Sequence, residues 1–221
     1  MDLFDFNVTC QVDGSLSKYI DPTDCISEYL VDIRYCRENS LKPAKIGMVH
    51  LLRVNANLAN EHGFSLFDAC DGHSQGLMEY HNALFKHRSN ELKTAIVERF
   101  EAYSGEILIL NLCAIDPRYR GHGLGLLASR RCIDLFGSGC DFVACFPCPM
   151  QVRGAFDIPE SYVSGFGSTK TKLGRIKLQR HWSQLGFSRI GRSKYFGLSL
   201  NHKHPTFNEL VDMLVESNYS E

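Results

Sequence analysis

Six residues in the middle of the chain, Arg120 to Gly125, have types and spacing that suit the binding of a phosphate group. They read Arg-Gly-His-Gly-Leu-Gly, so glycines alternate with larger residues. Glycine has no Cβ atom, so a phosphate can approach the backbone N–H groups of such a segment closely. If a helix begins here, its first N–H groups are unpaired and its dipole adds partial positive charge. The segment is therefore a candidate pyrophosphate site, in which His122 either approaches a phosphate or stays exposed.

The residues on either side supply the strand and the helix that this loop needs. The segment Ile107–Ile115 is apolar except for Asn111, which predicts a strand buried on both faces. Pro117 ends this strand, because it has no N–H for a β-ladder and restricts the residue before it. Apolar residues then recur at helical spacing over 124–136, which leaves the Arg130-Arg131 pair on the solvated side. The order is therefore strand, glycine loop, helix.

This order excludes two common phosphate motifs and resembles a third family. A P-loop needs Gly-Lys followed by Ser or Thr, and a dinucleotide fingerprint needs G-x-G-x-x-G directly after a strand; the sequence has neither. The stretch 107–200 instead resembles the GNAT superfamily of acyl-CoA-dependent N-acyltransferases. The residues that carry the resemblance are Ile115, Pro117, Tyr119, Arg120, Gly123, Gly125 and the later Leu185-Gly186-Phe187.

The resemblance implies a fold and a cofactor-binding site. It implies one α/β (α+β) domain over residues 1–221, with a mixed, mostly antiparallel, splayed sheet flanked by helices. In this family the loop amides hold the pyrophosphate of acetyl-CoA, and the backbone of the preceding strand pairs with the pantetheine arm. The implied acetyl-CoA ligands are Cys113, Ala114 and Ile115 of the strand and Arg120, Gly121, His122, Gly123, Leu124 and Gly125 of the loop.

The group that would take a proton from the acceptor amine departs from the family pattern. Acyl transfer from a thioester to an amine needs a route for that proton and hydrogen-bond donors for the carbonyl oxygen. Some relatives carry Glu or His at one of two positions of this strand. In this chain those positions are Ile109, which is apolar, and Asn111, which is polar. The Asn111 amide is therefore a candidate for holding a relaying water. It reads equally well as a hydrogen-bonded residue where the sheet splays.

The group that would protonate the leaving thiolate also departs from the pattern. Many relatives have a tyrosine four residues before the glycine of Leu-Gly-Phe, where this chain has Trp182. An indole donates a hydrogen bond but does not deliver a proton. The candidates are then Tyr162, which we prefer, His181 and Tyr195. A CoA thiol is a good leaving group, so unassisted departure as thiolate is the alternative.

The remaining chain predicts further elements around this unit. Alternation of apolar residues indicates strands, and apolar residues at helical spacing indicate helices. The strand after the crossover helix should lie parallel to Ile107–Ile115. The predicted elements are strands over 4–12, 29–35, 46–54, 141–146 and 190–200, a helical elaboration over 65–104 with Asn90 as an N-cap, an insertion loop over 149–173, a helix over 173–185 and a last helix opened by a Thr206–Glu209 capping box.

Charge and cysteine content favour a cytoplasmic protein without nucleic-acid or membrane partners. The formal net charge is -1, which gives no basic field, and no apolar run has the length of a membrane span. Nine cysteines in apolar contexts indicate reduced thiols. The pair Cys145 and Cys148 is the main rival signal, for a redox or zinc site, but a proline rather than a helix start follows it. A zinc site also needs a second pair, for which Cys70 with His73 and His202 with His204 are the closely spaced candidates. The sequence therefore predicts no metal.

The sequence is compatible with three functions. The first is an acetyltransferase that moves an acetyl group from acetyl-CoA to a primary amine by direct transfer in a ternary complex. The second is a catalytically weak acyl-CoA-binding or sensing module of the same fold. The third is a CoA-independent interaction protein. The first is our prediction, with a small molecule or a peptide as the acceptor and homodimer formation left open.

Overall fold

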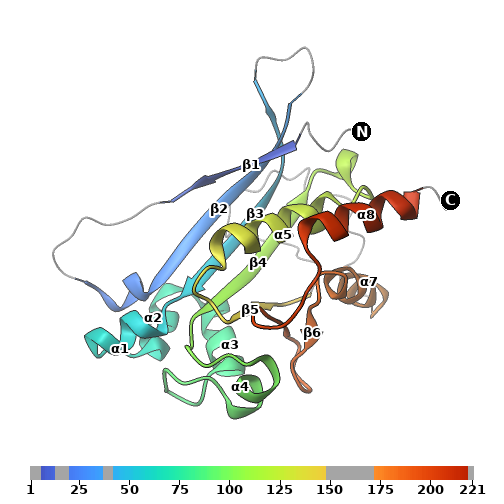
Figure 1. The fold of residues 1–221 in the computed structure, drawn as a ribbon. Helices are drawn as coiled ribbons and strands as arrows, with labels where there is room; N and C mark the ends of the chain where they lie inside the picture. The colour runs from blue at the N-terminus through green and yellow to red at the C-terminus, as the bar shows by residue number, and fades with distance from the viewer. Residues whose placement is uncertain (1–5, 13–19, 37–41, 148–171, 219–221) are drawn as a thin grey trace.

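The structure is a computed structural model, and it describes residues 6–12, 20–36, 42–147 and 172–218. Its centre is a seven-stranded sheet with the order β1-β2-β3-β4-β5-β7-β6 (Figure 1). Among the described strands, β4 and β5 pair in parallel and the other pairs are antiparallel, which confirms the predicted α+β class. The strands are β1 Phe6–Gln11, β2 Ile26–Tyr35, β3 Ala44–Val54, β4 Ile107–Ile115, β5 Phe142–Cys145, β6 Ser188–Arg189 and β7 Phe196–Ser199.

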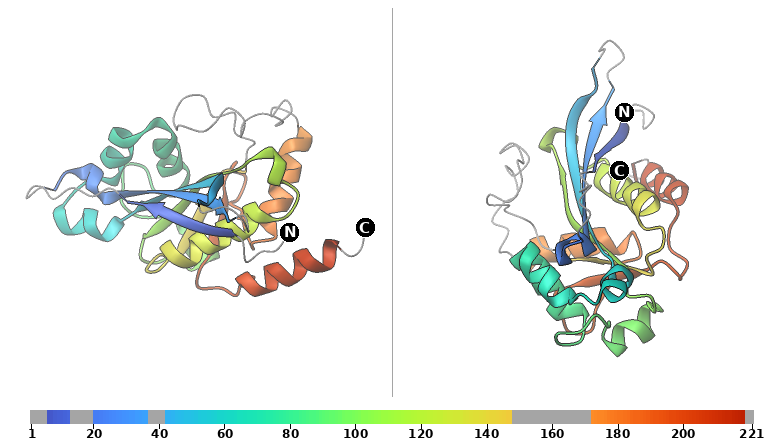
Figure 2. Two further views of the ribbon diagram at one scale, coloured as in Figure 1. Left: turned by 90° about the horizontal axis from the view of Figure 1, so that it is seen from above. Right: turned by 90° about the vertical axis from the view of Figure 1, so that its left-hand side faces the viewer.

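Helices cover both faces of this sheet, because β4 is apolar on both sides. Ile107 and Ile109 join one core with α1 to α4, whereas Leu108 and Leu110 join a second core with α5, α7 and α8. The right-hand view of Figure 2 shows α5 and α8 together on one side of the sheet. The helices are α1 Ala56–His62, α2 Leu66–His73, α3 Gln75–Leu84, α4 Thr94–Phe100, α5 Leu124–Phe136, α7 Lys172–Ser183 and α8 Phe207–Asn218, with 3-10 turns η2 Pro22–Cys25 and η3 Pro117–Tyr119.

The unit β4, loop, α5 and β5 is the parallel crossover that the sequence predicts. Strand β4 has the predicted bounds, and β5 pairs with it from Phe142 opposite Ile107 to Cys145 opposite Leu110. Beyond this point β5 ends, while β4 continues to Ile115. Within the described chain, the last part of β4 therefore has no strand beside it on its β5 side. This open edge is where the predicted splay lies.

The helical elaboration starts earlier than predicted and is built differently. Helix α1 precedes the segment 65–104, in which α2, α3 and α4 follow one another. Asn90 does not cap α4, which begins at Thr94. Its Oδ1 instead accepts a hydrogen bond of 2.8 Å from Leu66 N in α2, and its Nδ2 donates to Phe64 O. Asn90 therefore ties a loop to the start of a different helix, which spacing along the chain does not reveal.

The last third of the chain follows the predicted order with one change. The predicted strand over 190–200 is a hairpin, in which β6 and β7 pair across a turn that contains Gly191 at a φ of 51°. The capping box is confirmed, since Thr206 N donates to Glu209 and Glu209 N donates back to Thr206 Oγ1. Most of the insertion 149–173 lies outside the described residues, and its last two residues begin α7. None of the described helices has the length and apolar character that crossing a bilayer requires.

Candidate functional site

The glycine loop leads directly into the first turn of α5. Gly121 and Gly123 have φ values of 86° and 73°, a region that other residues rarely adopt. The first N–H of the helix that reaches a carbonyl is that of Leu126, which donates to Gly123 O over 2.9 Å. In the part of the chain that the structure describes, the N–H groups of Leu124 and Gly125 have no acceptor. The helix terminus therefore presents the unpaired donors that the sequence predicts.

Side-chain bonds hold the loop against the end of β4. The Nε of Arg120 donates to Ile115 O over 2.8 Å. Asp116 accepts from Arg118 N and from the Arg118 guanidinium, over 3.0 and 2.7 Å, and this contact lowers the pKa of the Asp116 carboxyl. Burial lowers the pKa of Arg120, although a guanidinium stays charged at neutral pH. Arg120 therefore fixes the loop and brings a positive charge to its edge.

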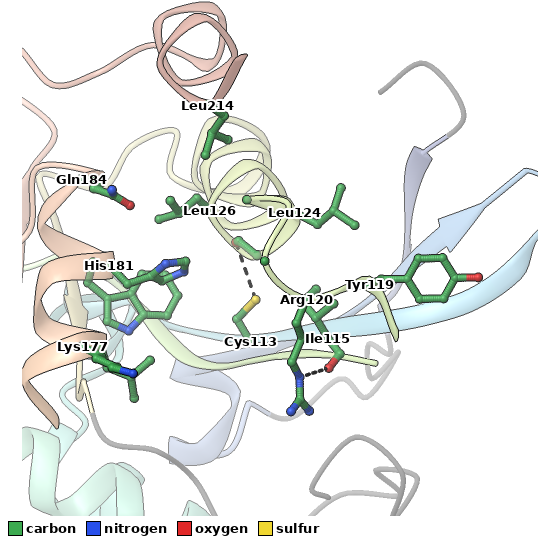
Figure 3. A pocket seen from close by; sticks show the side chains of 15 residues that line it. Cys113, Ile115, Tyr119, Arg120, Leu124, Leu126, Lys177, His181, Gln184 and Leu214 are labelled. Carbon is green, nitrogen blue, oxygen red and sulfur yellow. Dashed lines mark hydrogen bonds between the residues drawn. The ribbon is translucent and has the colours of Figure 1, made fainter. Parts of the chain in front are cut away.

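A cavity of about 420 Å³ opens beside this loop. Its walls are the open edge of β4, the glycine loop, the first turn of α5, one face of α7 and Leu214 of α8 (Figure 3). This volume falls within the range of cavities that hold small-molecule ligands. Seven of the nine predicted acetyl-CoA ligands line it: Cys113, Ile115, Arg120, Gly121, Gly123, Leu124 and Gly125.

The other two predicted ligands do not line the cavity. His122 is exposed in the loop, in agreement with the second of its two predicted placements. The carbonyl oxygen of Ala114 lies against Gly47 of β3, only 2.7 Å from where a Cβ there would stand. Because hydrogen-bonding groups alternate along a strand, Cys113 and Ile115 turn theirs toward the open edge. Ala114 therefore belongs to the ladder with β3 rather than to the site.

Helix α7 closes the cavity opposite β4 and brings His181 into it. His181 and Trp182 both line the cavity, and their rings meet edge to face (Figure 3). Trp182 is buried and also packs against Phe187, so its role is largely structural. Tyr162 lies outside the described residues. Tyr195 belongs to the core on the opposite face of the sheet.

His181 is therefore the titratable candidate that the structure brings to the site. The sequence placed it behind Tyr162, because a residue adjacent to Trp182 lies about 100° round the helix and was expected to face solvent or the core. Burial lowers the pKa of His181, so the imidazole is neutral at neutral pH. A neutral ring offers one donor and one acceptor. It can hydrogen-bond to a departing sulfur, but it is not a ready source of protons.

Cys113 borders the cavity in its neutral thiol form, which is a poor nucleophile. Its Sγ, on β4, lies 3.6 Å from the carbonyl oxygen of Gly125 in α5. Burial raises the pKa of Cys113 to about 11. Only a thiolate attacks a thioester efficiently, and at neutral pH almost none is present. The site therefore favours direct transfer over an acyl-cysteine intermediate.

Asn111 occupies a β-bulge at the point where β4 and β5 part. In the pairing with β3, His50 lies opposite Leu112 and Leu51 lies opposite Leu110, so Asn111 is the extra residue. Its Nδ2 lies 2.9 Å from Nδ1 of His50. The other ring nitrogen of His50 lies 2.7 Å from Oε1 of Glu28 in β2. The sequence singled out Asn111 but missed its partner His50 and the Glu28 behind it, both of which are far from Asn111 along the chain.

The rival sites find no support in the described residues. Cys145 is buried at the end of β5, and burial raises the pKa of its thiol well above the usual value, which disfavours redox chemistry there. Cys148 lies outside the described residues. No group of three or more potential metal ligands occurs in the described parts of the chain, and the cysteines found there are free. One expectation was wrong: Arg130 is buried on α5 and pairs with Asp134 one turn later, rather than facing solvent.

Comparisons of the chain with protein-family models, with curated proteins and with solved structures found no match. Support for a function therefore comes from the residues and geometry of the site.

Proposed function

We propose that the protein is an acyl-CoA-dependent N-acyltransferase that moves an acetyl group from acetyl-CoA to a primary amine. The observation that supports this most is that one cavity is bordered by two kinds of backbone that lack a strand or helix partner within the described residues. These are the N–H groups at the start of α5 and the open edge of β4. The first suits a pyrophosphate and the second suits the amide groups of a pantetheine arm.

Each part of acetyl-CoA then has a partner on this chain. The pyrophosphate meets the N–H groups between Gly121 and Gly125, with Arg120 adding charge at the edge. The pantetheine arm pairs with the backbone of Cys113 and with the N–H of Ile115, since the Ile115 carbonyl already accepts from Arg120. The thioester then reaches the bulge at Asn111, where β5 has ended and an amine can approach. Transfer is direct: the amine nitrogen bonds to the acetyl carbon, the carbon–sulfur bond breaks, and CoA leaves as thiolate. The nitrogen loses one proton to solvent water as the amide forms, and the thiolate takes up a proton from solvent after it leaves.

A specific observation favours a second candidate, the acyl-CoA-binding or sensing module. Trp182 occupies the position of the usual acid, and the neutral His181 beside it is a weak replacement. Such a module would bind acetyl-CoA in the same cavity without releasing CoA. Release of CoA in the presence of an amine separates the two candidates.

The proposed function is tested with acetyl-CoA and a panel of primary amines, with CoA thiol release as the readout. We expect one amine class to accelerate thiol release well above the rate with water alone. Calorimetric titration with acetyl-CoA is run in parallel. Binding without amine-dependent release would identify the sensing module, and the absence of binding would contradict both candidates.

Replacing His181 with alanine should lower the turnover number about tenfold, the effect of losing about one hydrogen bond to the departing sulfur. The affinity for acetyl-CoA should change much less, since the main contacts are made by the loop and β4. Steady-state kinetics with saturating acetyl-CoA measures the first quantity and calorimetry the second. Gln184→Ala, which removes another polar side chain from the cavity wall, is the matched control. Equal turnover of both variants and the wild type would mean that the thiolate leaves unassisted.

A further inference from the structure

Three side chains form a chain of contacts that ends at the bulge of β4. Glu28 comes from β2, His50 from β3 and Asn111 from β4, and both nitrogens of the His50 ring are in contact. The His50 side chain is only 2% exposed, whereas that of Glu28 is 50% exposed. A buried polar ring is costly unless both of its nitrogens have partners. In a neutral ring one nitrogen donates and the other accepts, so the role of one nitrogen determines the role of the other.

The protonation of this chain follows from which groups can donate. The ring nitrogen Nε2 lies 2.7 Å from Oε1 of Glu28, although the two groups are not aligned as a hydrogen bond. A carboxylate can only accept, and two lone pairs at this distance would repel each other, so this nitrogen carries the proton. Burial lowers the pKa of His50, against the opposing effect of Glu28, so the ring holds one proton at neutral pH. That proton is on Nε2, and Nδ1 is left as an acceptor. Nδ1 can then pair only with the NH₂ group of Asn111, and this matches the 2.9 Å contact with Nδ2.

We propose that Glu28 and His50 hold the Asn111 carboxamide in one orientation, with Oδ1 left at the bulge to accept an N–H of the primary-amine acceptor. The inference rests on the proposed function and deepens it by naming a group that binds the amine. Asn111 would contact the substrate, whereas Glu28 and His50 are positioning residues. An amine nitrogen aligned by Oδ1 keeps its lone pair for the acetyl carbon. This gives Asn111 a binding role in place of a proton-accepting one.

The single change Glu28→Gln tests this orientation with little change in shape. A glutamine can accept from Nε2 or donate to it, so the ring is free to move its proton to Nδ1 and Asn111 is free to flip. Nitrogen-15 NMR should show His50 of the wild type with its proton on Nε2, and the variant with a measurable fraction on Nδ1. With n-propylamine as acceptor, the Michaelis constant for the amine should rise about tenfold. The turnover number should change less, and acetyl-CoA affinity should not change.

Asp32→Asn is the matched control. It removes a carboxylate from the same strand, where Asp32 pairs with Arg34 and Lys45 rather than with His50. Its His50 spectrum and Michaelis constant should equal those of the wild type. His73, whose Nε2 lies 3.7 Å from Glu28, is the other titratable group facing that carboxylate, and His73→Gln checks that it does not set the tautomer.

Two results would overturn the proposal. One is a wild-type His50 with its proton on Nδ1. The other is a Glu28→Gln variant that does not differ from Asp32→Asn in amine Michaelis constant. A wild type that releases no thiol would refute the proposed function separately. In that case n-propylamine is titrated into the protein and the side-chain amide resonances of Asn111 are followed by NMR. If they do not shift, the inference is overturned as well.

Discussion

Replacing Gly125 with leucine should weaken acetyl-CoA binding on the order of a hundredfold, because the new side chain occupies space that the ligand needs. A Cβ at Gly125 would lie 3.5 Å from Cys113 Sγ and 3.8 Å from His181 Nε2, at ordinary contact distances. The atoms beyond it would enter the cavity between β4 and α7. Gly125 lies inside a helix without a positive φ, so the substitution adds no backbone strain. Calorimetric titration with acetyl-CoA measures the effect.

A graded series and a matched control separate this effect from unfolding. Gly125→Ala should bind nearly normally and should be more stable by about 0.5–1 kcal/mol, the helix-propensity difference between the two residues. Gly76 holds the same second position of helix α3 and has open space around its Cβ direction, so Gly76→Leu is the control for position and residue type. A folded Gly125→Leu protein with unchanged affinity would mean that the phosphates bind elsewhere.

Gly123 is a poorer choice for this experiment than the sequence suggests. A Cβ there would overlap with the side chain of Leu214 in α8, and the residue has a positive φ of 73°. A substitution would disturb the packing of α8 on α5 as well as the ligand site. Loss of binding in a Gly123 variant would therefore not identify the phosphate site.

Raising the pH from 7.5 to 9.5 should lower the free energy of unfolding by on the order of 5 kcal/mol, because buried thiols keep their protons only in the folded state. Burial raises the pKa of Cys70 to about 12 and that of Cys140 to about 11. It also raises the pKa of Cys132 and of Cys145 well above the usual value of a thiol, and raises the pKa of Cys113 to about 11. Urea unfolding in the presence of a reductant, at several pH values, measures the fall.

The sign of this effect follows from proton counting. A thiol in the unfolded chain titrates near pH 8.5, so above that pH the unfolded state binds fewer protons than the native state. Stability then decreases with rising pH, by up to about 1.4 kcal/mol per pH unit for each such group. Cys132→Ala should reduce the slope by about one such contribution, whatever its effect at pH 7.5. An unchanged slope in that variant, or flat stability in the wild type, would contradict the prediction.

Local sequence patterns are enough to predict the central unit of the fold and the nature of its loop. The β4 strand, the glycine turn and the start of α5 depend on local properties: an apolar run, a proline that ends it, and glycines where φ is positive. The parallel pairing of β4 with β5 followed from the connection, since a parallel pair needs a crossover. Seven of the nine predicted acetyl-CoA ligands line one cavity for the same reason, because they are close together along the chain.

The side chains that meet across different elements are known only once the elements are packed together. His181 lines the cavity beside Lys177 and Trp182 of the same helix, because the rotation of α7 is set by its packing on the core that it shares with α5 and α8. Glu28 and His50 reach Asn111 through the register of three strands and a bulge, which no spacing in the sequence encodes. Asn90 was misplaced for a related reason, since its partners lie on another helix. Contacts between residues distant in sequence depend on how the elements pack, and local patterns carry no information about that.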